Sequence, residues 1–202
     1  MKSLLLALLT CCFAGLGLAK AIPERFVSAL QRALDADATW EMTKTLPQAK
    51  HAITSSGLAS CWQEKGMIWK TLEPFEEEIR MAKTEMTFIV DDEVEVKPYD
   101  EMPYYEAICD ATDDFLKGDT DAFDDLFDWT WEAGEGDNWT MILKVRYRQM
   151  RRLFTTITLT GRETLETVTF LSGDASKGQI HLKFNETSRG QHTLWAIDSE
   201  TK

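Results

Sequence analysis

The stretch from Ala59 to Phe88, ASCWQEKGMIWKTLEPFEEEIRMAKTEMTF, decides the fold class. Short runs of mixed apolar and polar residues are separated by turn signals, of which Lys65-Gly66 and Pro74 are the clearest. These connections are too short for crossover helices, so we predict antiparallel hairpins, 58–64 with 67–71 and 75–81 with 85–90. The large apolar side chains are Trp and Met rather than Val and Ile, which suits a surface that adapts to a variable apolar partner.

The rest of the chain continues the β pattern, with two helical interruptions. Helical spacing of apolar residues predicts helices over 23–34, 104–118 and 121–127, and a short helical turn over 147–153. Further strands are expected at 39–46, 94–96, 128–132, 139–147, 154–160, 165–171, 179–184 and 194–197. The fold class is therefore mainly β, an antiparallel sheet of about 8–11 strands, which at that length curls and can enclose a cavity under its helices.

The first residues have the layout of a targeting segment. Lys2 is followed by an almost wholly apolar stretch over 4–18, and Ala19-Lys20-Ala21 has the small-x-small form of a cleavage site. We predict a cleavable signal peptide over 1–21 and a single domain over 22–202. The alternatives are an uncleaved N-terminal anchor, although the apolar stretch is short for a membrane span, and a lipid-modified cysteine at Cys11 or Cys12.

Charge and cysteine content narrow the class of partner. The chain of 202 residues has a formal net charge of −12, which disfavours nucleic acid and anionic bilayers as partners. Only Cys61 and Cys109 remain after the predicted cleavage. In an exported protein they form either a disulfide or two buried free thiols, and the sequence leaves both open.

No catalytic constellation is recognisable. His51, His181 and His192 lack partners at zinc-ligand spacing and lie in no nucleophile motif. The acidic run over 110–128 fails the spacing of a calcium loop. We therefore expect a protein that is not an enzyme and has no metal or cofactor; paired carboxylates for glycoside hydrolysis are the minor alternative, and no pair stands out.

The aromatic and methionine side chains are the main functional signal. Two interpretations remain open, an ordinary core rich in Trp and a surface that holds an apolar cargo. On the second, the predicted cavity-lining residues are Trp40, Met42, Trp62, Met67, Trp69, Phe75, Ile79, Met81, Met86, Phe88, Trp129, Trp131, Trp139 and Met141.

The order of elements resembles the outer-membrane lipoprotein carrier family, the LolA-like periplasmic proteins. The resemblance covers nearly the whole mature chain and rests on the strand 66–69 closing on Pro74, the helical interruption ending near Phe127, and the strands 139–143, 156–159 and 180–184. It implies a half-closed antiparallel barrel with a helical lid, and a monomer located in the periplasm. It also implies that the cargo is the acyl chains of lipids or lipoproteins, loaded by an inner-membrane donor and received by an outer-membrane acceptor. The corresponding lid residues are Tyr104, Tyr105, Ile108, Phe115, Leu126 and Phe127.

Two departures set this chain apart from the family pattern. Glu73 precedes Pro74 where the family has a basic residue that helps to latch the lid, and residues 82–84 replace an Asp-Gly turn. We therefore expect a divergent carrier of an acylated or lipid-like molecule, a lipoprotein or a glycolipid. A non-carrier docking module of the cell envelope is the second hypothesis, and an unrecognised hydrolase is the third.

Overall fold

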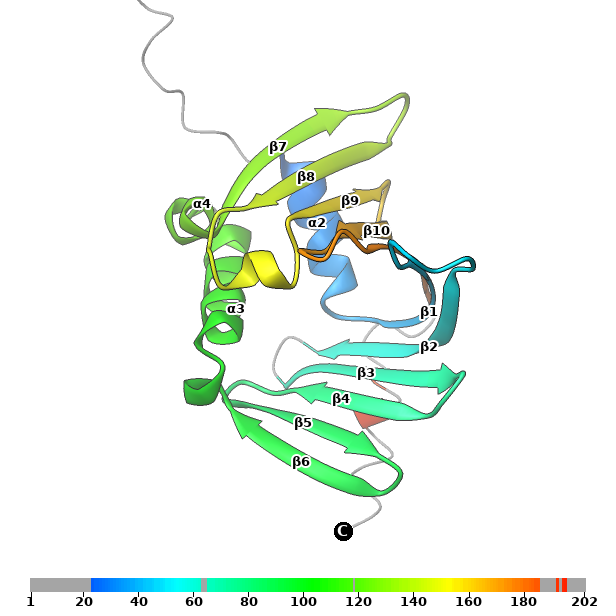
Figure 1. The fold of residues 1–202 in the computed structure, drawn as a ribbon. Helices are drawn as coiled ribbons and strands as arrows, with labels where there is room; N and C mark the ends of the chain where they lie inside the picture. Colours follow the sequence, from blue (N-terminus) through cyan, green and yellow to red (C-terminus); the bar gives the residue numbers. More distant parts are fainter. Residues whose placement is uncertain (1–22, 63–64, 118, 186–191, 193, 196–202) are drawn as a thin grey trace, which may run out of the picture.

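The computed structural model describes residues 23–62, 65–117, 119–185, 192, 194 and 195, so the predicted signal peptide lies outside it. In this part of the chain, eleven strands form one antiparallel sheet with the order β6-β5-β4-β3-β2-β1-β11-β10-β9-β8-β7. The sheet curls and stays open, with β6 and β7 as its two edges (Figure 1). The predicted mainly β class is confirmed. The strands are β1 (Asp37–Thr45), β2 (Ile53–Trp62), β3 (Gly66–Glu73), β4 (Glu77–Met81), β5 (Glu85–Val90), β6 (Glu93–Pro98), β7 (Phe127–Ala133), β8 (Trp139–Val145), β9 (Thr156–Gly161), β10 (Leu165–Leu171) and β11 (Lys177–Phe184).

Alternation along β1 fixes which side chains face inward. Trp40 is buried and Met42 half-buried, whereas Thr39 and Thr43 are exposed, as a strand period of two requires. Directly paired residues share a face, so the register Trp40 opposite Leu182 carries the same face into β11. We call this the concave face, because the helices lie against it within the curl (Figure 1).

The helices are α2 (Glu24–Ala33), α3 (Pro103–Leu116) and α4 (Asp121–Leu126), with short 3-10 turns η1 (Tyr99–Glu101) and η2 (Met150–Arg152). In α2 an acidic residue, Glu24, stands in the first turn and a basic one, Arg32, in the last, which matches the helix dipole. Its buried face consists of Phe26, Ala29 and Ala33. The small alanines let the helix approach the sheet closely.

Two apolar clusters occupy the concave face, one toward each end of the sheet. The first cluster joins α2, α3 and α4 to β7, β8, β9 and β10, so the helices fill this half of the curl. The second cluster has Met86, Tyr99 and Met102 at its centre. The chain from η1 through α3 connects the two, starting at the second cluster and ending in the first at Phe115, across the open side of the sheet (Figure 1).

Three local predictions differ from the structure. β2 begins at Ile53 instead of residue 58, because Ser55 and Ser56 are strand residues too, and the pairing with β3 only shifts register between Ser56 and Gly57. The helical turn expected over 147–153 is limited to η2. The strand expected over 194–197 is not formed at Leu194 and Trp195, whose backbone is helical, and its remainder lies outside the described residues. None of the helices in the described ranges is long and apolar enough to cross a bilayer.

Candidate functional site

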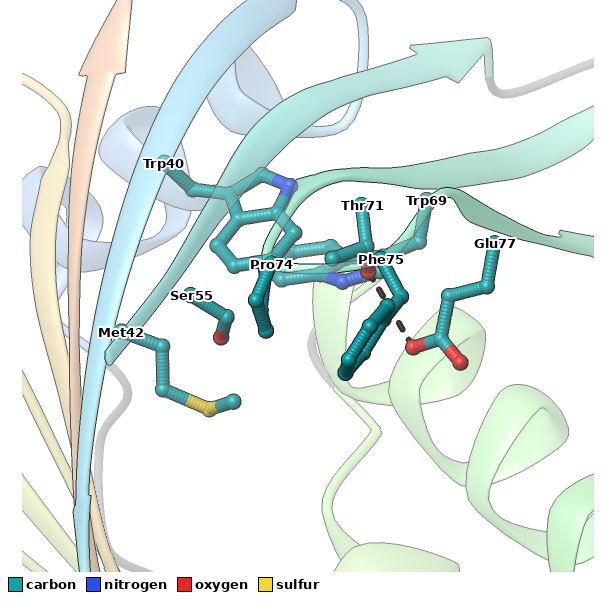
Figure 2. A pocket seen from close by; sticks show the side chains of 8 residues that line it. All are labelled: Trp40, Met42, Ser55, Trp69, Thr71, Pro74, Phe75 and Glu77. Carbon is teal, nitrogen blue, oxygen red and sulfur yellow. Dashed lines mark hydrogen bonds between the residues drawn. The ribbon is translucent and has the colours of Figure 1, made fainter. Parts of the chain in front are cut away.

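A pocket opens on the concave face between the two clusters. It has a volume of about 170 Å³ and lies where β1, β2 and β3 meet the turn into β4 (Figure 2). The lining residues are Trp40, Met42, Ser55, Trp69, Thr71, Pro74, Phe75 and Glu77. Most of the lining is apolar, with three polar side chains among it, which is the usual make-up of a site for an apolar or amphipathic ligand.

Two stacked indoles form one wall of the pocket. The rings of Trp40 and Trp69 lie 4.4 Å apart between centroids with 20° between their planes. The Trp40 indole N–H donates to the Leu58 carbonyl at 3.1 Å, which fixes the ring's orientation. Gly57 allows this arrangement, because a Cβ there would lie 2.8 Å from Trp40 Cζ2 and 1.9 Å from the Lys70 carbonyl oxygen.

The opposite side of the pocket is apolar and loosely held. Met42 is half-buried, and its unbranched thioether can adopt several rotamers. Phe75 lies in the turn between β3 and β4 and is 82% exposed, the largest exposure among the big apolar residues of the described chain. A phenylalanine that lines a pocket and is still open to water leaves its ring available to a guest.

The polar lining residues differ in their bonding. The Thr71 hydroxyl donates to Glu77 Oε1 at 3.1 Å. By contrast, Ser55 Oγ is buried and has no hydrogen-bond partner among the described residues. A buried hydroxyl without a partner is uncommon in folded proteins.

The structure brings together at the pocket four of the predicted cavity-lining residues, Trp40, Met42, Trp69 and Phe75. Sequence reasoning missed the other four, Ser55, Thr71, Pro74 and Glu77. Ser55, Thr71 and Glu77 each lie two positions from an inward-facing residue of the same strand and therefore share its face, but small or charged side chains in strands are ordinarily assigned to solvent.

A second group of the predicted residues lies farther along the same face. Ile79, Met81 and Phe88 pack against buried Met86, beneath Tyr99 and Met102. Met67 pairs directly with Met81 and is half-buried. These side chains form the second cluster and its border, beyond the pocket lining.

The remaining predicted lining residues lie elsewhere. Trp129, Trp139 and Met141 are buried in the first cluster, and Trp131 packs against it. Here α2 supplies Phe26, whose ring meets the edge of Trp139 at 5.1 Å, so this part of the concave face is filled.

Trp62 alternates with Cys61 and therefore points to the convex face. There its ring stacks on His192 at 4.6 Å, and His192 Nε2 lies 3.2 Å from Asp35 Oδ1. Trp62 therefore does not line the pocket of the concave face.

The predicted lid residues divide between the two clusters. Tyr105 packs against the second cluster. Ile108, Phe115, Leu126 and Phe127 belong to or border the first. Tyr104 lies in α3, but its side chain is outside what the structure describes.

Both cysteines of the described chain are free thiols, so the disulfide that the sequence left open is not formed here. Burial, and then the negative charge of Asp37, raise the pKa of Cys61 to about 12. Cys109 lies on α3 next to Tyr99 and is exposed as a residue, but the partial burial of its thiol raises its pKa as well. No three His, Cys, Asp or Glu side chains of the described ranges gather as a metal site requires.

No protein-family model matches the chain, and no curated protein matches its sequence. Among solved structures, it is similar to a putative outer membrane lipoprotein-sorting protein domain from Vibrio parahaemolyticus, at 9% identity over 84% of this chain and 97% of that one, with a TM-score of 0.38. It is also similar to a LolA superfamily protein from Nitrosomonas europaea, at 8% identity over 81% and 92%, with a TM-score of 0.39. A DUF1329 family protein from Desulfovibrio piger matches at 9% over 84% and 96%, with a TM-score of 0.35.

At 8–9% identity and TM-scores of 0.35–0.39, these likenesses carry no conclusion about what this chain does. What those proteins bind is a property of their own residues. What this chain binds has to be inferred from the residues of its own pocket.

Proposed function

We propose that the protein is an exported carrier that binds an acylated or lipid-like molecule in the pocket of its concave face and shuttles it through the periplasm toward the outer membrane. The observation that carries this proposal is an open, mostly apolar hollow on the inner face of an otherwise well-packed sheet. Burying an acyl chain contributes about 0.8 kcal/mol for each methylene removed from water.

The size of the pocket bears on how a cargo enters. Its volume of about 170 Å³ lies below the roughly 300–1,000 Å³ of drug-sized sites. A long acyl chain therefore requires the side chains of Met42 and Phe75 to move aside. Met42 is flexible and Phe75 is exposed, so both can do so. The segment from η1 to α3, which contacts both clusters, is the candidate lid.

A pair of variants on β1 tests this function. Met42→Glu introduces a charge into the pocket, whereas Thr43→Glu introduces the same charge at the next position, which faces outward. We expect a fluorescent acyl probe to bind the wild-type protein and the Thr43→Glu variant saturably and to lose binding to Met42→Glu. Equal binding by all three, or no saturable binding by the wild type, would count against a carrier.

The second candidate is a docking module of the envelope that uses the same fold without a cargo. The observation in its favour is the filled half of the concave face, where α2 and the tryptophans of β7 and β8 leave a packed core. This candidate predicts that the protein purified from its native envelope carries a protein partner and no acylated molecule. Mass spectrometry of the co-purified material distinguishes the two.

The proposed carrier role includes further expectations. An inner-membrane donor would load the cargo and an outer-membrane acceptor would receive it, and the carrier itself would act as a monomer without catalytic chemistry. The acidic balance of the chain keeps it from adhering to anionic membrane surfaces between the two steps.

A further inference from the structure

The unpartnered hydroxyl in the pocket points to a feature of the cargo. Ser55 Oγ is buried, has no partner among the described residues and points into the pocket (Figure 2). A hydroxyl in this position is stabilised when a guest supplies a hydrogen-bond acceptor. A purely hydrocarbon guest would leave it unsatisfied.

Two neighbouring hydrogen-bond donors are already engaged. The Trp40 indole N–H donates to Leu58, and the Thr71 hydroxyl donates to Glu77. The buried Ser55 hydroxyl can therefore donate to an acceptor on the guest without breaking an existing hydrogen bond.

The charge of the pocket decides what kind of acceptor fits. Glu77 lines the pocket, and Glu73 and Glu76 flank Pro74 and Phe75 in the adjoining turn. Lys70 compensates Glu76, with Nζ 2.6 Å from Oε1. A carboxylate on the guest would bring a second negative charge beside Glu77, and because Glu77 is exposed, this repulsion is strongest at low salt.

We propose that the pocket selects acyl chains with an uncharged head, an ester or an amide, whose carbonyl accepts a hydrogen bond from Ser55 Oγ, and that Glu77 excludes free fatty acids. The inference rests on the proposed function, because it concerns the same pocket. It adds the specificity of the site and names the two residues that set it.

Calorimetric titration with mono-octanoylglycerol, octanamide and octanoate tests the proposal on the wild-type protein. The two neutral probes cover the ester and amide sources, and octanoate has the same chain with a charged head. We expect the neutral probes to bind at least about tenfold tighter than octanoate at low salt. Octanoate binding as tightly as both neutral probes overturns the selection.

Two matched pairs of variants separate the roles of the residues. Ser55→Ala should weaken the neutral probes by roughly threefold to tenfold, whereas Ser56→Ala, which faces outward on the same strand, should leave them unchanged. Glu77→Gln keeps an acceptor for Thr71 and should tighten octanoate by about tenfold. Glu132→Gln, an exposed residue of β7, removes the same charge at a distance and should have little effect.

The outcomes distinguish this inference from the proposed function. If no probe binds the wild-type protein, the carrier function itself fails. If the probes bind but the Ser55 and Ser56 variants behave alike, the hydroxyl has no role and the inference is wrong. The wild-type comparison of neutral and charged probes needs no variant, so it stands even if a variant does not fold.

Discussion

Substitution of Phe75 should weaken cargo binding without lowering the stability of the fold, because its ring lines the pocket and is 82% exposed. A phenylalanine buries about 150 Å² or more when covered, so at this exposure roughly 120 Å² is available to a guest. Covering half of that area contributes about 1.5 kcal/mol at 25 cal/mol per Å². Phe75→Ala should therefore weaken binding of mono-octanoylglycerol roughly tenfold. Its free energy of unfolding should change by less than about 0.5 kcal/mol, because little of the ring is buried in the free protein.

Calorimetry measures the first quantity, and urea unfolding followed by tryptophan emission measures the second. Val94→Ala is the matched control, since Val94 is 63% exposed on β6 and pairs with Ile89, one position away from the inward-facing Phe88. This control should leave both quantities unchanged. The reasoning is refuted if Phe75→Ala binds the probe as the wild type does, or if it loses more than about 1 kcal/mol of stability.

Three further predictions concern the sheet and its titrating groups. Gly57→Ala should lower the free energy of unfolding, measured in urea, by roughly 3 kcal/mol or more, because its Cβ would meet a backbone oxygen at 1.9 Å. Gly136→Ala has open space around it and should cost only about 1 kcal/mol, because its backbone is left-handed. Equal losses would contradict this. Burial raises the pKa of Cys61 to about 12, so its thiol should react slowly near neutral pH. Mass spectrometry after alkylation of the native protein should therefore find the exposed Cys109 modified first, and modification of Cys61 first would refute this prediction. Burial, with Cys109 next, also raises the pKa of Tyr99 from 10.0 to about 12. The neutral phenol is favoured in the folded state, so its stabilisation is complete below pH 10 and lost as the pH rises through about 12. The unfolding free energy should fall over this window more in the wild type than in Tyr99→Phe, and parallel curves would argue against it.

The sequence predicted the strands and their antiparallel pairing well, because alternation and short turns are local signals. In β1 the alternation is clear enough to place Trp40 and Met42 on the inner face. Trp62 shows the limit of this approach, since a step of one residue along β2 moves it to the other face.

Which part of the concave face would be filled could not be predicted from local pattern. Trp129 and Trp139 point inward as expected, but α2, far away in sequence, supplies the Phe26 that covers them. Ser55 was missed for another reason: a Ser-Ser-Gly segment is typical of turns, and its inward position follows only from the register with β1, in which it lies opposite Met42.

Quenching of tryptophan emission by a mono-acylglycerol with a brominated chain tests most directly whether the hollow holds an acyl chain, since the stacked indoles of Trp40 and Trp69 form its wall. We predict saturable quenching of the wild-type protein, reduced in Trp69→Phe and retained in Trp131→Phe, whose indole belongs to the filled half. Absence of saturable quenching, or the same loss in both variants, would contradict the account.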